Sequence, residues 1–240
     1  RINECDQRKN TTGVNKKIIK SNQFIDHTVY VSSWLRDLYI EEGIGFRNNT
    51  VIYAGANENK FNTINKIFWD GSRKIKLVTH HWSSNPMKGW RDYKTIDKML
   101  SDSKWRNKLD FTYIGNLSEN QKFKNTNVIT PLKENDLAKE LKKHDIYITG
   151  SLNEPSGNHH IEAAQSGLPI LYRESGGIPE YCENYGVPFS NDLEMSLSEI
   201  ISNYETYKNK VLNYPNNSSV MSSQFLELFE TLLKNKENII

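Results

Sequence analysis

From about residue 51 onward, short apolar runs rich in β-branched and aromatic residues alternate with longer stretches of helical periodicity. Each short run ends at Gly, Pro or a polar residue, as strands commonly do. The predicted strands are 51–54, 75–79, 110–114, 127–129, 145–149 and 168–172. Alternating strands and helices are typical of βαβ units. The sequence therefore predicts an α/β fold with a parallel sheet and helices on both faces.

Helices are predicted between most of these strands and at the end of the chain. The clearest internal examples are 90–100 and 134–143, where Leu137 and Leu141 form an apolar stripe at helical spacing. The chain closes with two helices and no strand, at 193–207 and 218–234. Pro215 precedes the last helix, and Ser218 or Ser219 is suited to cap it.

The first 45 residues have a different pattern. A polar stretch rich in Asn and Lys leads into one strand, 28–32, and one helix, 33–42. Because one strand cannot bury itself, we interpret residues 1–45 as the remnant of another, N-terminal domain, with 43–49 as the linker. Residues 46–215 then form a ligand-binding domain, and 216–240 a helix expected to pack back toward the N-terminal domain.

Charge and cysteine content exclude several functional classes. The 31 Lys and Arg nearly balance 29 Asp and Glu, so a net charge of +2 provides no broad field for nucleic acid. No apolar run approaches the roughly 18 residues of a membrane-spanning helix. Only Cys5 and Cys182 are present, without a pairing motif, which is typical of a reducing compartment. We expect a cytoplasmic chain and leave open a peripheral contact with the inner face of the membrane.

The most informative segment follows the predicted strand 145–149. A loop leads to Gly157 at the start of a helix, where the N–H groups of Gly157, Asn158 and His159 can receive a phosphate or a sugar hydroxyl. Glu154 lies in the loop and Glu162 lies in the helix, eight residues later. The two carboxylates could line one pocket and bind different hydroxyl groups, although spacing alone is equally compatible with two solvated acids.

Two further loops are expected at the same edge, because ligands bind at the carboxyl ends of parallel strands. The loop after strand 75–79 contains Lys88 just before a helix, in position for a diphosphate. A Gly-rich turn at 175–180 follows strand 168–172. His80 and His81 could contact phosphate or could be a polar loop pair. His159 and His160 are adjacent, point about 100° apart on a helix and cannot chelate one metal together.

The order of these motifs resembles the donor-binding domain of retaining GT-B glycosyltransferases, the group 1 glycosyl transferase family. The resemblance rests on Lys88-Gly89, a strand ending in Gly115, Glu154 and Glu162 with seven residues between them, Gly167-Leu168-Pro169, and Gly176-Gly177-Ile178-Pro179-Glu180. Residues 26–35 resemble the last strand and helix of that family's N-terminal domain, and 51–57 the strand and turn that open its second domain. The similarity extends over nearly the whole chain from residue 26.

The resemblance implies a Rossmann-like domain that binds a UDP- or GDP-linked sugar. It further implies transfer to a glycan or lipid-linked acceptor with retention of configuration and without a metal or cofactor, as in polysaccharide biosynthesis. Glu154 would be catalytic, at the sugar hydroxyls. Lys88 would neutralise the diphosphate, Glu162 would bind the ribose, and the backbone near Leu132 would meet the base. The implied donor-binding residues are Ser83, Lys88, Gly89, Leu132, Gly157, Asn158, His159 and Glu162.

The chain also departs from the family pattern. His80-His81-Trp82-Ser83 stands where the family usually has an arginine, and Pro155-Ser156 stands where it often has Gly-Phe. A sugar-nucleotide epimerase of similar architecture and a non-catalytic binding module are the alternative functions. A dinucleotide oxidoreductase is disfavoured, since no G-x-G-x-x-G motif follows the first strand. Because both domains would form the catalytic cleft, we expect these 240 residues to bind donor but to transfer sugar poorly.

Overall fold

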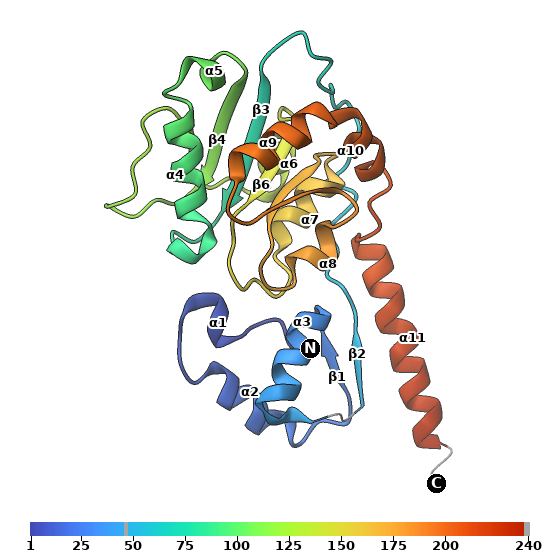
Figure 1. Cartoon of the computed structure of the whole chain (residues 1–240). Coiled ribbons are helices and arrows are strands. Elements are labelled where there is room, and N and C mark those ends of the chain that lie inside the picture. The colour runs from blue at the N-terminus through green and yellow to red at the C-terminus, as the bar shows by residue number, and fades with distance from the viewer. Residues whose placement is uncertain (46–47, 238–240) are drawn as a thin grey trace.

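The computed structural model describes residues 1–45 and 48–237, which form two layers and one projecting helix (Figure 1). The larger part, which we call the sheet domain, begins after residue 51. The smaller part, the N-terminal layer, comprises the described residues up to 51. The predicted domain boundary at 45/46 and part of the predicted linker fall on 46–47, outside the described residues.

The sheet domain is built on a parallel sheet with the order β5-β4-β3-β6-β7-β8. Its strands are β3 (Ile75–His81), β4 (Leu109–Gly115), β5 (Asn127–Ile129), β6 (Ile146–Thr149), β7 (Ile170–Arg173) and β8 (Gly186–Phe189). Counted along the chain within this sheet, the order is 3-2-1-4-5-6, that of dinucleotide-binding folds. The direction of strand order reverses between β3 and β6, so this is where a ligand crevice is expected.

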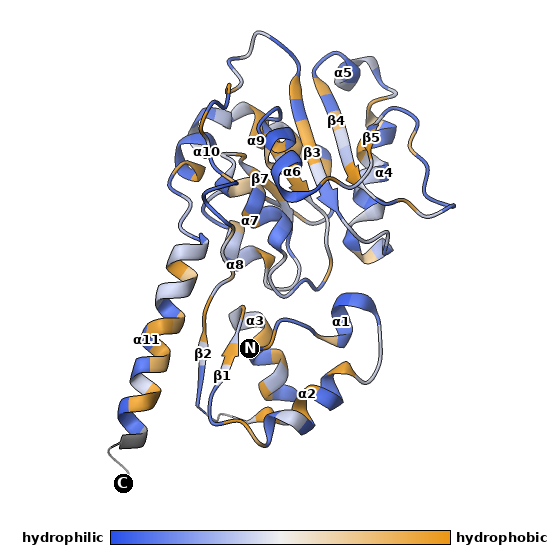
Figure 2. Cartoon of the chain, turned by 180° about the vertical axis from the view of Figure 1, so that it is seen from behind, coloured by the Kyte–Doolittle hydropathy of each residue, from blue (hydrophilic) through white to orange (hydrophobic). Residues whose placement is uncertain are grey.

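The period-2 pattern of the strands explains why helices cover both faces of the sheet. Leu77 packs into one core and its neighbour Val78 into the other. Tyr147 likewise faces away from Ile146 and Ile148. Each core is closed by apolar helix faces, and the loops around the sheet are largely hydrophilic (Figure 2). Apart from the edge strand β5, the strands of this sheet are therefore largely buried on both sides, as parallel strands usually are.

The helices of the sheet domain mostly coincide with the predicted ones. They are η2 (Pro86–Lys88), α4 (Trp90–Met99), α5 (Ser103–Arg106), α6 (Glu134–Leu141), α7 (Asn158–Gln165), α8 (Ile178–Cys182), α9 (Leu193–Ser202) and α10 (Tyr204–Val211). The predicted helix 193–207 is in fact two helices. Asn203, with φ −108° and ψ 23°, interrupts the helical backbone, and the turn allows Tyr204 to join the core.

The N-terminal layer corrects one strand assignment. Its elements are α1 (Asp6–Lys9), α2 (Val14–Asn22), β1 (Thr28–Tyr30), α3 (Ser33–Tyr39), η1 (Ile40–Ile44) and β2 (Asn49–Val51). Strand β2 pairs in parallel with β1. The predicted strand 51–54 therefore does not open the main sheet. Its first residue ends β2, which supplies β1 with a partner from downstream, and 52–54 form no strand.

Helix α11 (Ser218–Glu237) leaves the sheet domain and runs beside β2 in both views (Figures 1 and 2). Its first turn is anchored by Glu58, whose carboxylate accepts hydrogen bonds from the backbone N–H of Ser218 (3.1 Å) and from the Ser218 hydroxyl (2.6 Å). Farther along, the Arg1 guanidinium lies 5.5 Å from the ring centre of Phe225. Among the described residues, no helix combines the length and the apolar character needed to cross a membrane.

Candidate functional site: a cleft at the carboxyl ends of β3 and β6

A cleft of about 440 Å³ opens where the strand order reverses. This volume is in the range of small-molecule sites. The cleft receives residues from the end of β3, from the loops that follow β3 and β6, from α7, and from the N-terminal layer. The lining residues are Asn3, Arg8, His80, His81, Trp82, Ser83, Lys88, Glu154, Ser156, Gly157, Asn158, His159 and Glu162.

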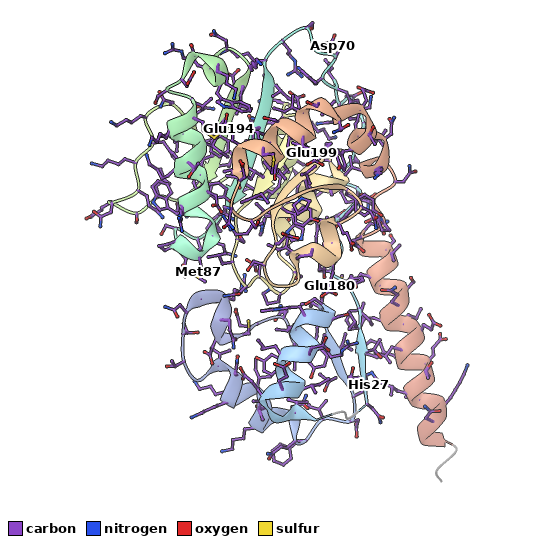
Figure 3. The ribbon with its side chains drawn as sticks, in the orientation of Figure 1. His27, Asp70, Met87, Glu180, Glu194 and Glu199 are labelled. Carbon is purple, nitrogen blue, oxygen red and sulfur yellow. The ribbon has the colours of Figure 1, made fainter. Side chains whose placement is uncertain are left out.

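The loop after β3 is held against the loop after β6 by a close backbone approach. Gly89 has φ +97°, and a Cβ added there would lie 2.6 Å from the Cα of Gly150. The backbone N–H of Leu152 also donates to the carbonyl of Met87 at 2.8 Å. Figure 3 shows Met87 at the edge of the sheet domain that faces the N-terminal layer. Lys88 is thereby held directly beside the loop that carries Glu154.

Glu154 is almost fully buried, at 2% exposure, and it is paired with two cations. One carboxylate oxygen contacts the ammonium of Lys88, and the other lies 2.7 Å from Nε of Arg8 in α1. Burial lowers the pKa of Lys88, whereas the Glu154 carboxylate opposes that shift. A buried carboxylate requires such pairing, so the two layers meet through the charge of this residue.

The Gly-rich turn after β7 supports the backbone of Glu154. The N–H of Gly177 donates to the Glu154 carbonyl at 2.9 Å. Gly176 has φ +66°, and a Cβ there would lie 2.5 Å from the same carbonyl oxygen. At Gly177 an added Cβ would meet the carbonyl of Pro155 at 2.2 Å. This turn therefore reaches the cleft by packing beneath the Glu154 loop, and the cleft-lining side chains come from other segments.

Glu162, in helix α7, is held by a histidine of strand β3. Nε2 of His80, at the end of β3, lies 2.9 Å from Oε2 of Glu162 in α7. Both side chains line the cleft, and Glu162 keeps 21% of its side chain exposed. The carboxylate therefore has one oxygen fixed by an imidazole and remains accessible to a ligand.

Three more histidines lie in or beside the cleft, and their burial keeps them neutral at ordinary pH. Burial lowers the pKa of His81 and of His159 well below the usual value, and that of His160 to about 3. The rings of His81 and His159 are 4.8 Å apart, and Nε2 of His159 lies 2.9 Å from the Thr149 hydroxyl. Within the described residues, no group of three or more His, Cys, Asp or Glu is placed to hold a metal ion.

The cleft brings together most of the predicted site residues. Those that line it are Ser83, Lys88, Glu154, Gly157, Asn158, His159 and Glu162. Gly157, with φ +73°, caps α7, and a Cβ there would lie 2.9 Å from the Glu154 side chain. Gly89 follows Lys88 in the sequence and is not itself among the lining residues. Leu132 packs against the core on the α7 side and is not among the lining residues, so its contact with a base stays a prediction.

Sequence reasoning did not identify the two lining residues from the N-terminal layer. Asn3 and Arg8 are separated from Glu154 by about 150 residues, and no local motif marks either of them. Their position depends on how the N-terminal layer sits against the sheet domain, which no periodicity encodes.

Several solved structures share this fold. Sucrose-phosphate synthase from Thermosynechococcus elongatus aligns with a TM-score of 0.65 at 15% identity, over 93% of this chain and 63% of that one. HepE from Anabaena, in complex with UDP-glucose, aligns with a TM-score of 0.70 at 15% identity, over 90% and 67%.

The pneumococcal O-GlcNAc transferase GtfA, in complex with UDP and GlcNAc, aligns with a TM-score of 0.69 at 14% identity. That alignment covers 90% of this chain and 47% of GtfA. The chain thus spans about half to two thirds of these relatives. At these identities the structural likeness shows the fold, which is that of GT-B glycosyltransferases.

Comparison of the sequence with curated proteins gives no match. The sequence does match a family, described as Glycosyl transferases group 1, over residues 107–238. The matched segment includes β6, α7 and the loop between them, which provide Glu154 and Glu162. Because the match covers more than half of the 240 residues, the chain belongs to the group 1 glycosyl transferase family.

Proposed function

We propose that this chain is the donor-binding part of a glycosyltransferase that uses a nucleotide-activated sugar. The observation that carries the proposal is the composition of the cleft: one lysine, a helix N-terminus and two carboxylates at the switch point of a parallel sheet. A nucleoside diphosphate sugar presents hydroxyl groups at both ends and negative charge between them. The carboxylates of the cleft can accept hydrogen bonds from such hydroxyl groups, and its cationic groups can pair with the diphosphate.

Each group of the donor has a proposed partner. Lys88 and the first N–H groups of α7, from Gly157 to His159, bind the diphosphate, since both favour negative charge. Glu162, oriented by His80, accepts hydrogen bonds from the ribose hydroxyls. Glu154 accepts hydrogen bonds from the transferred sugar. The complexes of HepE with UDP-glucose and of GtfA with UDP and GlcNAc support a donor of this class.

In the proposed reaction, the bond between the anomeric carbon and the diphosphate oxygen breaks, and the diphosphate leaves with the bonding electron pair. A hydroxyl oxygen of the acceptor forms the new bond to the anomeric carbon, and its proton passes to the departing diphosphate oxygen. Lys88 and the amides of α7 stabilise the charge on the leaving group, and Glu154 stabilises positive charge on the sugar. We further propose retention of configuration and a glycan or lipid-linked acceptor.

Calorimetric titration with UDP, GDP and ADP and their glucose conjugates tests the donor site. We expect saturable binding of one nucleotide, weakened about tenfold or more in Lys88→Gln, because that substitution removes a charge-assisted contact. Glu162→Ala should weaken binding by a similar factor. Lys98→Gln, an exposed lysine on α4 outside the cleft, is the matched control. Absence of binding by all three nucleotides would contradict the proposal.

The stereochemistry and the extent of transfer need a separate assay. We propose that the 240 residues bind donor but transfer sugar slowly, since the chain spans only about half to two thirds of the solved relatives and an acceptor would be bound mainly by residues outside the sheet domain. Proton NMR of the product formed from an α-linked donor should show an α-linked product. A β-linked product would exclude retention, and rapid transfer by the purified chain would exclude the need for further acceptor-side residues. The base, the sugar, the acceptor and the inner-membrane location stay predictions.

A further inference from the structure

Two residues near the start of the chain, Asn3 and Arg8, line the same cleft as Lys88 and the first turn of α7, although they belong to the N-terminal layer. Of these two, Arg8 is the cation, and its Nε lies 2.7 Å from Oε1 of Glu154. Nη1 of the same guanidinium contacts Glu4 at 3.0 Å, so its orientation is fixed from behind. The segment also contacts the Glu154 loop where the Asn153 amide donates to the Gln7 carbonyl at 3.4 Å.

Two cations share one carboxylate in the cleft. Lys88 contacts one oxygen of Glu154 and Arg8 contacts the other. A diphosphate has more negative charge than one carboxylate and offers oxygens along its whole length. A guanidinium can bind phosphate through two parallel hydrogen bonds, whereas the ammonium of a lysine acts as a point charge. Arg8 is therefore better suited than Lys88 to bind a phosphate in a fixed orientation.

We propose that Arg8 is a second phosphate-binding residue of the donor site and that the N-terminal layer supplies it from across the cleft. The inference rests on the proposed function, because it assigns a further contact to the same nucleotide. When the diphosphate binds, Arg8 and Lys88 exchange part of their contact with Glu154 for contact with phosphate. That exchange frees an oxygen of Glu154 to accept a hydrogen bond from the sugar. Donor binding is thereby coupled to the contact between the two layers.

The neighbouring lysine provides a matched control. Lys9 lies in the same short helix, contacts the same Glu4 at 3.0 Å and is 53% exposed, but it is not a lining residue. Arg8→Gln and Lys9→Gln therefore remove the same charge from the same helix. Only the first substitution removes a cation from the cleft.

The experiment compares wild type, Arg8→Gln, Arg8→Lys and Lys9→Gln by calorimetry. The probes are UDP, GDP and ADP, which contain the diphosphate, and uridine, guanosine and adenosine, which lack it. For the base that wild type binds, we expect Arg8→Gln to weaken the diphosphate about tenfold or more, and the nucleoside by less than about twofold. Arg8→Lys should fall between wild type and Arg8→Gln, and Lys9→Gln should match wild type.

The outcomes separate this inference from the proposed function. If wild type binds none of the diphosphates, the proposed function fails and this inference fails with it. If wild type binds one of them and Arg8→Gln binds it equally well, only the role of Arg8 is refuted. An equal loss for nucleoside and diphosphate would show a purely structural role and would also refute it.

Discussion

Glu180 joins the two layers by capping a helix of one with a side chain of the other. It lies in α8 of the sheet domain, at the junction that Figure 3 shows. Its carboxylate accepts hydrogen bonds from the backbone N–H groups of Ser33 (2.8 Å) and Trp34 (2.7 Å), the first two residues of α3. The next free N–H of α3, that of Leu35, is capped by the Ser32 hydroxyl at 3.2 Å. The N-terminus of α3 is thus satisfied mainly from across the interface.

The cost of removing this carboxylate can be worked from these contacts. Hydrogen bonds to a charged group contribute about 1.5 to 3 kcal/mol each. Ser33 and Trp34 are only partly buried, so water can replace part of the loss and the lower end applies. The two bonds from α3 then give about 3 kcal/mol for Glu180→Ala, and the lost hydrogen bond from the Tyr53 hydroxyl (3.1 Å) adds to this cost. Glu180→Gln keeps an accepting oxygen without the charge and should lose about half of that.

Urea unfolding of wild type, Glu180→Ala and Glu180→Gln measures these differences, and hydrogen exchange of residues 33–39 locates them. We expect faster exchange at the start of α3 in both variants. Glu183→Ala, an exposed acid just beyond α8, is the matched control. If Glu180→Ala unfolds within about 0.5 kcal/mol of Glu183→Ala, the cross-layer cap does not stabilise the chain as argued.

Three further outcomes follow from other contacts. Burial lowers the pKa of Lys66 to about 8, so the native state loses the proton of the Lys66 ammonium at a lower pH than the unfolded state does. Relative to Lys66→Met, the free energy of unfolding of wild type should therefore rise by about 2 kcal/mol between about pH 8 and about pH 10, as measured by urea unfolding. An unchanged difference would contradict the buried ammonium. Gly89→Ala places a Cβ against Gly150 at positive φ and should cost about 2 kcal/mol of unfolding free energy; a neutral variant would show that the loops can separate. His80→Ala releases Glu162 and should weaken nucleotide binding about threefold to tenfold in calorimetry, whereas an equal loss for pyrophosphate, which has no ribose, would argue against that role.

The main sheet was predictable because most of its strands have a local signature. Five predicted strands, from 75–79 to 168–172, correspond to β3 through β7 within a few residues. Strand β8 was missed because Pro188 interrupts its apolar run, and proline is tolerated there because the strand lies at the sheet edge. Of the predicted strand 51–54, only the first residue lies in a strand, because the partner that a strand pairs with is set by contacts distant in the sequence.

The candidate site divides in the same way. Lys88, Glu154 and Glu162 were predictable as site residues because each follows or faces the end of a strand, and parallel strands end at one edge. Arg8 was not predictable, because its place in the cleft depends on the packing of two layers. The sequence predicts His80 as a phosphate contact or a polar loop residue. Its pairing with Glu162 depends on how β3 packs against α7, which no local motif encodes.

A crystal structure of the chain with the nucleoside diphosphate that it binds tests the central claim most directly. The account predicts the diphosphate between Lys88 and the N-terminus of α7, with the ribose hydroxyls at Glu162. A second basic cavity, of about 410 Å³ and lined by Lys74, Lys76 and Arg106, lies where β3 and β4 begin. A nucleotide bound there, with the cleft at the carboxyl ends of the strands left empty, would contradict the account.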